Sequence, residues 1–167
     1  MAGKRMIDEN ICIDKRLNAV KEGAENLFYR LLVKTDDNGN VFAEPDLIKG
    51  QLYPRRLDIS LEEIQARLDE LHNATGGNGF GLIIIYEKNR EKYAHLPGFF
   101  KYQRLRTDIK PKVIYPIPTK EDLERIRNKS LPQVSKDKKD KEVSKEEIVN
   151  FKILYKNAES LDRKSVV

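Results

Sequence analysis

Apolar residues recur every three or four positions in three stretches of the chain, which is the spacing of one buried face of an α-helix. Helices are therefore predicted over residues 21–34 and 60–73, with a shorter helix in DLIKGQLYP that Pro54 ends. Ser60 followed by Glu63 forms a capping box, which marks the start of the third helix. The positions expected to face a core are Val20, Ala24, Leu27, Phe28, Leu31 and Leu32, then Leu47, Ile48 and Leu52, then Leu61, Ile64, Leu68 and Leu71.

Two runs rich in β-branched and aromatic residues, FGLIIIYE and KYAHLPGF, flank the polar tip KNRE and predict a β-hairpin. A short extended piece, VFAEP, comes earlier, after the turn TDDNGN. The order of helix, short strand, helix, helix and hairpin is that of a winged helix-turn-helix domain. The predicted fold class is mainly α with a small β-hairpin, in a winged-helix domain over residues 10–106.

The chain changes character after residue 106. Three prolines in DIKPKVIYPIP favour an extended segment, and Thr119 with Asp122 caps a short charged helix, KEDLERIRNK. Residues 107–143 are therefore predicted to be an extended, charged linker that contains a short helix. Residues 144–163 predict a C-terminal amphipathic helix, whose apolar stripe includes Ile148, Phe151, Leu154 and Leu161. This stripe either packs on its own chain, mediates self-association or docks on a partner protein.

The residue types that carry catalysis or bind metals do not gather in any recognisable pattern. Cys12 is the single cysteine, and no cluster of cysteines and histidines has the spacing of zinc ligands. His72 and His95 have no nucleophile nearby in sequence, and the glycines of TGGNGFG lack the lysine and hydroxyl of a phosphate-binding loop. We expect a non-enzymatic protein that needs no cofactor and no metal. The lack of a long apolar run predicts a soluble, cytoplasmic protein that makes no membrane contact.

Positive charge is concentrated in the later part of the chain, whose net charge is +5. Residues 1–100 contain 14 Lys and Arg against 16 Asp and Glu, whereas residues 101–167 contain 18 against 11. This asymmetry indicates an acidic partner such as nucleic acid, or else a solvated tail. The outward face of the third helix is acidic, with Glu62, Asp69 and Glu70, and such a face repels phosphates.

DNA contacts are therefore expected mainly as phosphate contacts from the wing and the basic segment after it, rather than from the third helix. Phe99 is expected to close the hairpin onto the helices. Tyr102 either packs there or stacks on unpaired bases, because adjacent side chains of an extended segment face opposite ways. The candidate DNA-binding residues are Arg55, Arg56, Lys88, Arg90, Lys92, Lys101, Tyr102, Arg104, Arg106, Lys110 and Lys112.

Residues 10–110 resemble the N-terminal winged-helix domain of phage and prophage replication-initiation proteins, the replisome-organiser or DnaD-like group. The order and spacing of several short motifs carry the resemblance: a D-x-x-G turn, an LxxL helix, two aromatic strands and a KxQR tail. The matching residues are Asp36, Gly39, Leu68, Leu71, Gly81 to Ile83, Tyr86, Tyr93, Leu96 to Phe99, Lys101, Gln103 and Arg104. The ATGGNGF segment is longer than the join usual in that group, and residues 111–167 do not resemble its C-terminal domain.

The resemblance implies a DNA-binding protein of replication initiation, without catalytic residues, in a bacterial or phage-infected cell. Its partner is DNA, duplex or single-stranded, and the C-terminal helix is a candidate contact for a replication protein or a second copy. Two alternatives remain open: a winged-helix transcriptional regulator with one preferred operator, and a protein-interaction adaptor whose acidic third helix binds a basic partner.

Overall fold

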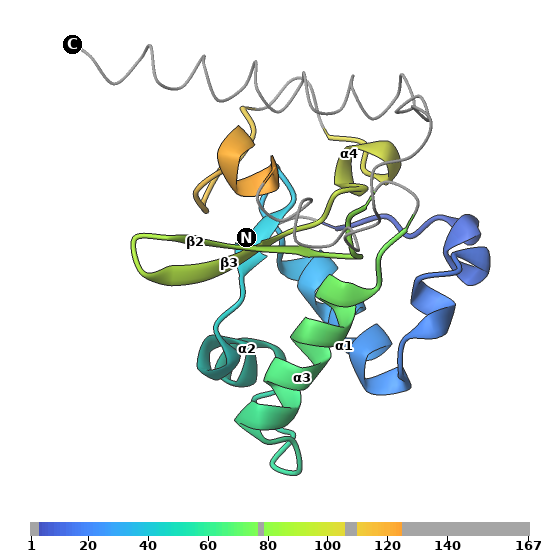
Figure 1. The fold of residues 1–167 in the computed structure, drawn as a ribbon, viewed down its shortest axis with the longest axis vertical. Coiled ribbons are helices and arrows are strands. Elements are labelled where there is room, and N and C mark those ends of the chain that lie inside the picture. Colours follow the sequence, from blue (N-terminus) through green and yellow to red (C-terminus); the bar gives the residue numbers. More distant parts are fainter. Residues whose placement is uncertain (1–3, 77–78, 106–109, 125–167) are drawn as a thin grey trace, which may run out of the picture. The chain divides into compact units, whose positions relative to one another are not determined.

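The computed structural model describes residues 4–76, 79–105 and 110–124 (Figure 1). Within these ranges the chain is a mixed α/β domain, with helices and a small three-stranded antiparallel sheet. Its helices are α1 (Glu22–Lys34), α2 (Pro45–Leu52), α3 (Leu61–Asn73) and the short α4 (Phe99–Tyr102), preceded by two 3₁₀ turns, η1 (Glu9–Ile13) and η2 (Leu17–Ala19). Its strands are β1 (Asn40–Phe42), β2 (Ile84–Lys88) and β3 (Glu91–His95).

Among the three longer helices, α3 is central and packs against both α1 and α2. Ile64, Leu68 and Leu71 are fully buried, as the spacing predicts, and the Ser60 side chain caps α3 by accepting from the Glu63 amide. Two predictions on the apolar stripes are wrong, because Leu47 and Leu61 remain 43% and 44% exposed. Each lies in the first turn of its helix, and a stripe is buried only where another element covers it.

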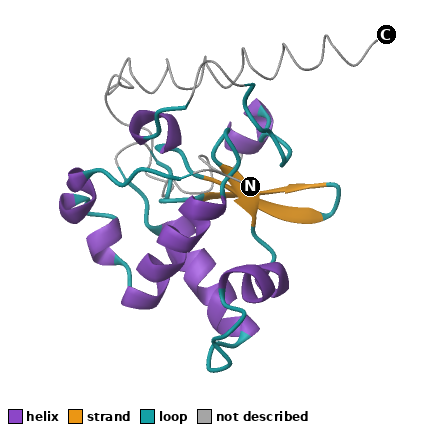
Figure 2. Ribbon diagram, turned by 180° about the vertical axis from the view of Figure 1, so that it is seen from behind, coloured by secondary structure: helices purple, strands orange, loops and turns teal. Residues whose placement is uncertain are grey.

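The sheet has the order β1-β3-β2, with all neighbours antiparallel. The predicted hairpin is confirmed as β2 and β3 (Figure 2). In its register Lys88 lies opposite Glu91. Asn89 and Arg90 form its two-residue turn and both have left-handed backbones, with φ of 54° and 66°. This is the geometry of a type I′ turn, which matches the twist of the strands. The expected extended piece supplies the third strand, β1.

The sheet joins the helices by a close backbone contact at the end of α3. The Leu82 amide donates to the Leu71 carbonyl at 3.0 Å, and His72 Nδ1 lies 3.2 Å from the Ile83 carbonyl oxygen. A Cβ on Gly81 would lie 2.0 Å from the His72 carbonyl oxygen, so that this approach requires glycine. His72 therefore anchors the edge strand rather than facing solvent freely.

The segment after β3 differs from the expected extended strand. Pro97 and Gly98 form a turn, and Phe99–Tyr102 is one helical turn, α4. Phe99 is 2% exposed, which confirms its predicted place in the core. Neighbouring side chains do not alternate in direction here as they do along a strand, because Phe99 and Tyr102 are three residues apart on a helix.

Residues 110–118 are extended, as their prolines predict, but they are held against the folded domain. The buried carboxylate of Asp36 accepts four backbone N–H groups: Asn38 and Asn40 at Oδ1, and Ile114 and Tyr115 at Oδ2. The Tyr115 ring packs near Phe42 and Tyr93, and the Tyr86 hydroxyl donates to the Pro116 carbonyl at 2.6 Å. We call residues 110–118 the strap.

Residues 120–124 are helical, as the capping box at Thr119 predicts. The Thr119 amide donates to Asp122 Oδ2 at 2.8 Å, and the Asp122 amide donates to Thr119 Oγ1 at 3.3 Å. Leu123 is 5% exposed. The amphipathic helix predicted over residues 144–163 lies outside the described residues.

Candidate nucleic-acid interface

The candidate cations lie in three parts of the domain. Lys88, Arg90 and Lys92 belong to the hairpin, and Arg55 and Arg56 to the loop between α2 and α3. In Figures 1 and 2 the hairpin projects from one side, the α2–α3 loop lies at the end away from the sheet, and α2 lies between them. Lys101 and Tyr102 on α4, with Arg104, Lys110 and Lys112 after it, form the third group; Arg106 lies outside the described residues.

The hairpin tip presents two exposed cations, Arg90 and Lys92. Arg90 occupies a turn position with positive φ, where glycine is the residue that fits best. The backbone of Lys92 is fixed, since its amide donates to Glu44 Oε1 at 2.9 Å, while its side chain is exposed. Glu87 lies opposite Lys92 in the register and reduces the local positive charge.

Lys88 is not free to bind a phosphate in this structure. Its Nζ lies 2.9 Å from Asp122 Oδ2, and the two side chains are 29% and 17% exposed. The partner comes from the helical turn after the strap, 34 positions along the chain. The sequence shows Asp122 as a capping residue, but its second role depends on the fold.

The α2–α3 loop offers one exposed arginine and one that is paired. Arg55 is exposed, whereas the Arg56 guanidinium makes two hydrogen bonds to the Asp58 carboxylate, at 2.9 and 2.8 Å. Hydrogen bonding to Arg56 lowers the pKa of the Asp58 carboxyl to about 2. The ammonium of Lys49 donates to the backbone carbonyls of Arg56 and Ile59, and these two hydrogen bonds hold the loop backbone in place. Lys49 therefore has a structural role here.

α4 and the residues after it also carry exposed cations. Lys101 Nζ lies 5.5 Å from the centre of the Tyr102 ring, a cation–π contact. Tyr102 is 37% exposed, and Arg104 is exposed as well. The exposed Lys110 and Lys112 follow. The Lys112 amide donates to Asp37 Oδ2 at 2.7 Å, and the Lys112 carbonyl accepts from the Asp37 amide at 3.1 Å.

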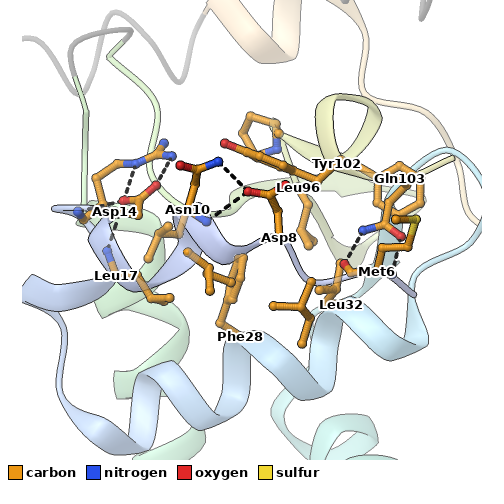
Figure 3. Close-up of a pocket in the computed structure, with 17 residues that line it drawn as sticks. Met6, Asp8, Asn10, Asp14, Leu17, Phe28, Leu32, Leu96, Tyr102 and Gln103 are labelled. Atoms are coloured by element: carbon orange, nitrogen blue, oxygen red, sulfur yellow. Dashed lines mark hydrogen bonds and ion pairs between the residues drawn. The ribbon is translucent and has the colours of Figure 1, made fainter. Parts of the chain in front are cut away.

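Tyr102 also lines a small cavity, shown in Figure 3, between the N-terminal segment, α1 and α4. Phe28, Leu32 and Leu96 are among its apolar lining residues, and Asp8 and Asp14 are among the polar ones. Its volume of about 90 Å³ is well below that of small-molecule sites, about 300 Å³ or more. A cavity of this size offers little support for a nucleotide site.

The exposed face of α3 is acidic in the folded chain, as the sequence indicates. Gln65 donates to Asp69 at 2.9 Å, and Glu70 accepts from the Lys21 amide at 2.7 Å. Arg67 does not offset this charge, because its side chain is 14% exposed and is bonded to Glu63. Its guanidinium also lies 5.8 Å from the centre of the Tyr53 ring.

Three further charged or titratable side chains proved to be structural. Asp36 binds the strap, and Arg5 donates to the Thr35 carbonyl at 2.7 Å and to Asp37 at 3.1 Å. His95 is buried on β3, with its Nδ1 2.9 Å from Asn40 Oδ1. Each of these contacts joins residues far apart in sequence, so that no local pattern indicates them.

Within the described part of the chain, no group of three or more His, Cys, Asp and Glu is placed to hold a metal ion. None of the helices in these described ranges is both long enough and apolar enough to cross a membrane. Comparisons with models of protein families, with curated proteins and with solved structures give no match to this chain.

Proposed function

We propose that this chain is a winged-helix DNA-binding protein that acts in phage-type replication initiation and binds mainly through phosphate contacts. The observation that supports the proposal most is the element order, α1-β1-α2-α3-β2-β3, with the hairpin and β1 in one sheet of order β1-β3-β2. This order is typical of winged-helix domains, in which the hairpin is the wing. We therefore call β2 and β3 the wing.

The distribution of free cations favours contacts from the wing, the α2–α3 loop and the segment on and after α4. In this last segment Lys101, Arg104, Lys110 and Lys112 are exposed. Arg55, Arg90 and Lys92 are exposed, and no ion pair joins them to another described residue. Their positions on projecting segments allow them to reach phosphates on either side of α2 (Figure 1). The acidic face of α3 disfavours deep insertion of that helix into a major groove, because its carboxylates repel the DNA backbone.

The residues behind the sequence resemblance mostly hold the fold together. Asp36 binds the strap, Leu68 and Leu71 are buried, and Gly81 permits the approach of the sheet to α3. Gln103 exchanges two hydrogen bonds with the backbone of Met6, at 2.9 and 2.8 Å. The resemblance thus supports a shared architecture, and the replication role in this proposal comes from the family that it indicates.

A second candidate function is a protein-interaction adaptor, favoured by the acidic exposed face of α3. In this case Glu62 and Asp69 contact a basic protein, and the wing does not bind DNA. The two functions differ in their response to DNA, since the adaptor has no affinity for it.

Fluorescence anisotropy with labelled duplex, single-stranded and forked DNA at two salt concentrations tests the proposal. We expect binding that weakens steeply with salt, with a log–log slope of roughly −0.9 per phosphate contacted on duplex DNA. Forked DNA should bind at least as well as duplex, and unrelated duplex sequences should bind alike. Strong preference for one sequence would favour a transcriptional regulator instead. A lack of binding to all three DNAs at low salt would leave the adaptor.

A further inference from the structure

One wing lysine is paired with an acidic residue that lies beyond the wing in sequence. Lys88 is the last residue of β2, next to the turn, and its Nζ lies 2.9 Å from Asp122 Oδ2. Of the ion pairs among the described residues, this one joins the wing to the segment after the strap. A carboxylate at this distance occupies the position that a phosphate oxygen takes when a lysine binds DNA.

The fold holds Asp122 in place before any ligand arrives. Its carboxylate accepts from the Thr119 amide at 2.8 Å and from the Thr119 hydroxyl at 2.7 Å. The neighbouring Leu123 is buried, and the strap before Thr119 is held by Asp36 and Tyr86. Asp122 therefore loses little additional conformational freedom when it pairs with Lys88.

The ionised form of Asp122 is favoured in this position. Burial opposes it, but hydrogen bonds from Thr119 and Lys88 outweigh burial and lower the pKa of the Asp122 carboxyl. The other acid near Lys88 is Glu91, which lies opposite it in the register, and the Tyr93 hydroxyl donates to the Glu91 carboxylate. Asp122 is thus the acid bonded to Lys88 among the described residues.

We propose that Asp122 acts as an internal competitor that withholds Lys88 from DNA and thereby weakens the affinity of the wing. This inference rests on the proposed DNA-binding function and concerns the regulation of the same surface. DNA must displace the carboxylate before Lys88 can contact a phosphate. A partner that drew the segment after the strap away from the wing would add one phosphate contact and raise the affinity.

The test is a double-mutant cycle in the full chain, with Asp122→Asn, Lys88→Gln and both together, measured by anisotropy with a random duplex. A partly exposed ion pair of this kind contributes about 0.2–1 kcal/mol, so Asp122→Asn should tighten binding by roughly 1.4- to fivefold. Lys88→Gln should weaken binding little in the wild-type background and should abolish the gain in the Asp122→Asn background.

Glu121→Gln is the matched control, because it removes the same charge from the adjacent, exposed residue. It should change affinity much less than Asp122→Asn does. Equal effects of the two substitutions, or a gain that persists when Lys88 is also replaced, would overturn the inference; a persisting gain would indicate that Asp122→Asn merely loosens the segment. Absence of binding by the wild type and all variants would instead overturn the proposed function itself.

Discussion

His95 lies fully buried on β3, next to Asn40, and its burial lowers the pKa of the imidazole to about 4. An unfolded histidine has a pKa near 6.5, so the unfolded chain takes up a proton first as the pH falls. The unfolding free energy contributed by neutral His95 is therefore present above pH 6.5 and is lost as the pH falls toward 4.

This loss amounts to at most about 1.4 kcal/mol per pH unit. The variant His95→Asn should be less stable at pH 7, but its unfolding free energy should fall less between pH 6.5 and 4. Urea denaturation at several pH values measures both effects. The same pH slope in wild type and variant would show that His95 is not the titrating group.

Arg90 combines an unfavourable backbone conformation with an exposed cation at the tip of the wing. Glycine at this turn position removes the steric strain of positive φ, so Arg90→Gly should stabilise the domain by about 0.5–1 kcal/mol. The same change should weaken DNA binding, because it removes a phosphate contact. Asn89→Gly is the matched control: it changes the neighbouring turn residue and should leave affinity unchanged. Thermal melts and anisotropy on both variants separate the two effects.

Gly81 lies where the sheet backbone meets the end of α3. An alanine Cβ would come within 2.0 Å of the His72 carbonyl oxygen, so Gly81→Ala should cost about 2 kcal/mol or more. Gly50→Ala is the control, because a Cβ there meets nothing within 4 Å inside helix α2, and it should stabilise by about 0.5–1 kcal/mol. Opposite shifts in the denaturation midpoint are therefore expected.

Among the elements, those with a strong periodic pattern were predictable from the sequence. α3 has both an apolar stripe and a capping box, and the wing has two β-branched runs around a polar turn. α4 was not predictable, because four residues are too few to show a period. The place of the strap was not predictable either, since it depends on Asp36, 78 or more positions away in sequence.

The same distinction holds for the candidate site. Exposure of Arg55, Arg90 and Lys92 agrees with their polar surroundings in sequence. The pairing of Lys88 with Asp122 depends on where the chain places a residue after the strap, and no local signal carries that information.

Asp36 determines whether the strap stays attached to the domain. In Asp36→Asn an amide NH₂ group replaces one of the two oxygens that accept backbone N–H groups, so at least one pair of donors loses its acceptor. We expect a loss of about 2–4 kcal/mol in unfolding free energy and faster tryptic cleavage after Lys112. Asp69→Asn, on the exposed face of α3, should change the unfolding free energy by no more than about 0.5 kcal/mol and should leave the cleavage rate unchanged. Equal cleavage rates in the two variants would contradict this role of Asp36.

At the scale of the whole described domain, charge is segregated by surface. The wing, the α2–α3 loop and the segment on and after α4 carry exposed cations, while the outer face of α3 carries acids. In most helix-turn-helix proteins the corresponding helix reads bases in the major groove. Here the arrangement favours contact with the DNA backbone, with little discrimination between sequences.

The most direct test of this account is the salt dependence of duplex binding by the wild type, by the double variant Arg90→Glu with Lys92→Glu, and by Lys15→Glu. Lys15 is an exposed lysine between η1 and η2, a segment that lies across the domain from the wing in Figures 1 and 2. We predict that the wing variant loses at least about tenfold in affinity and that its log–log slope is shallower by roughly 1–2, whereas Lys15→Glu keeps the wild-type slope. Equal slopes and affinities for the two variant proteins would contradict binding through the wing.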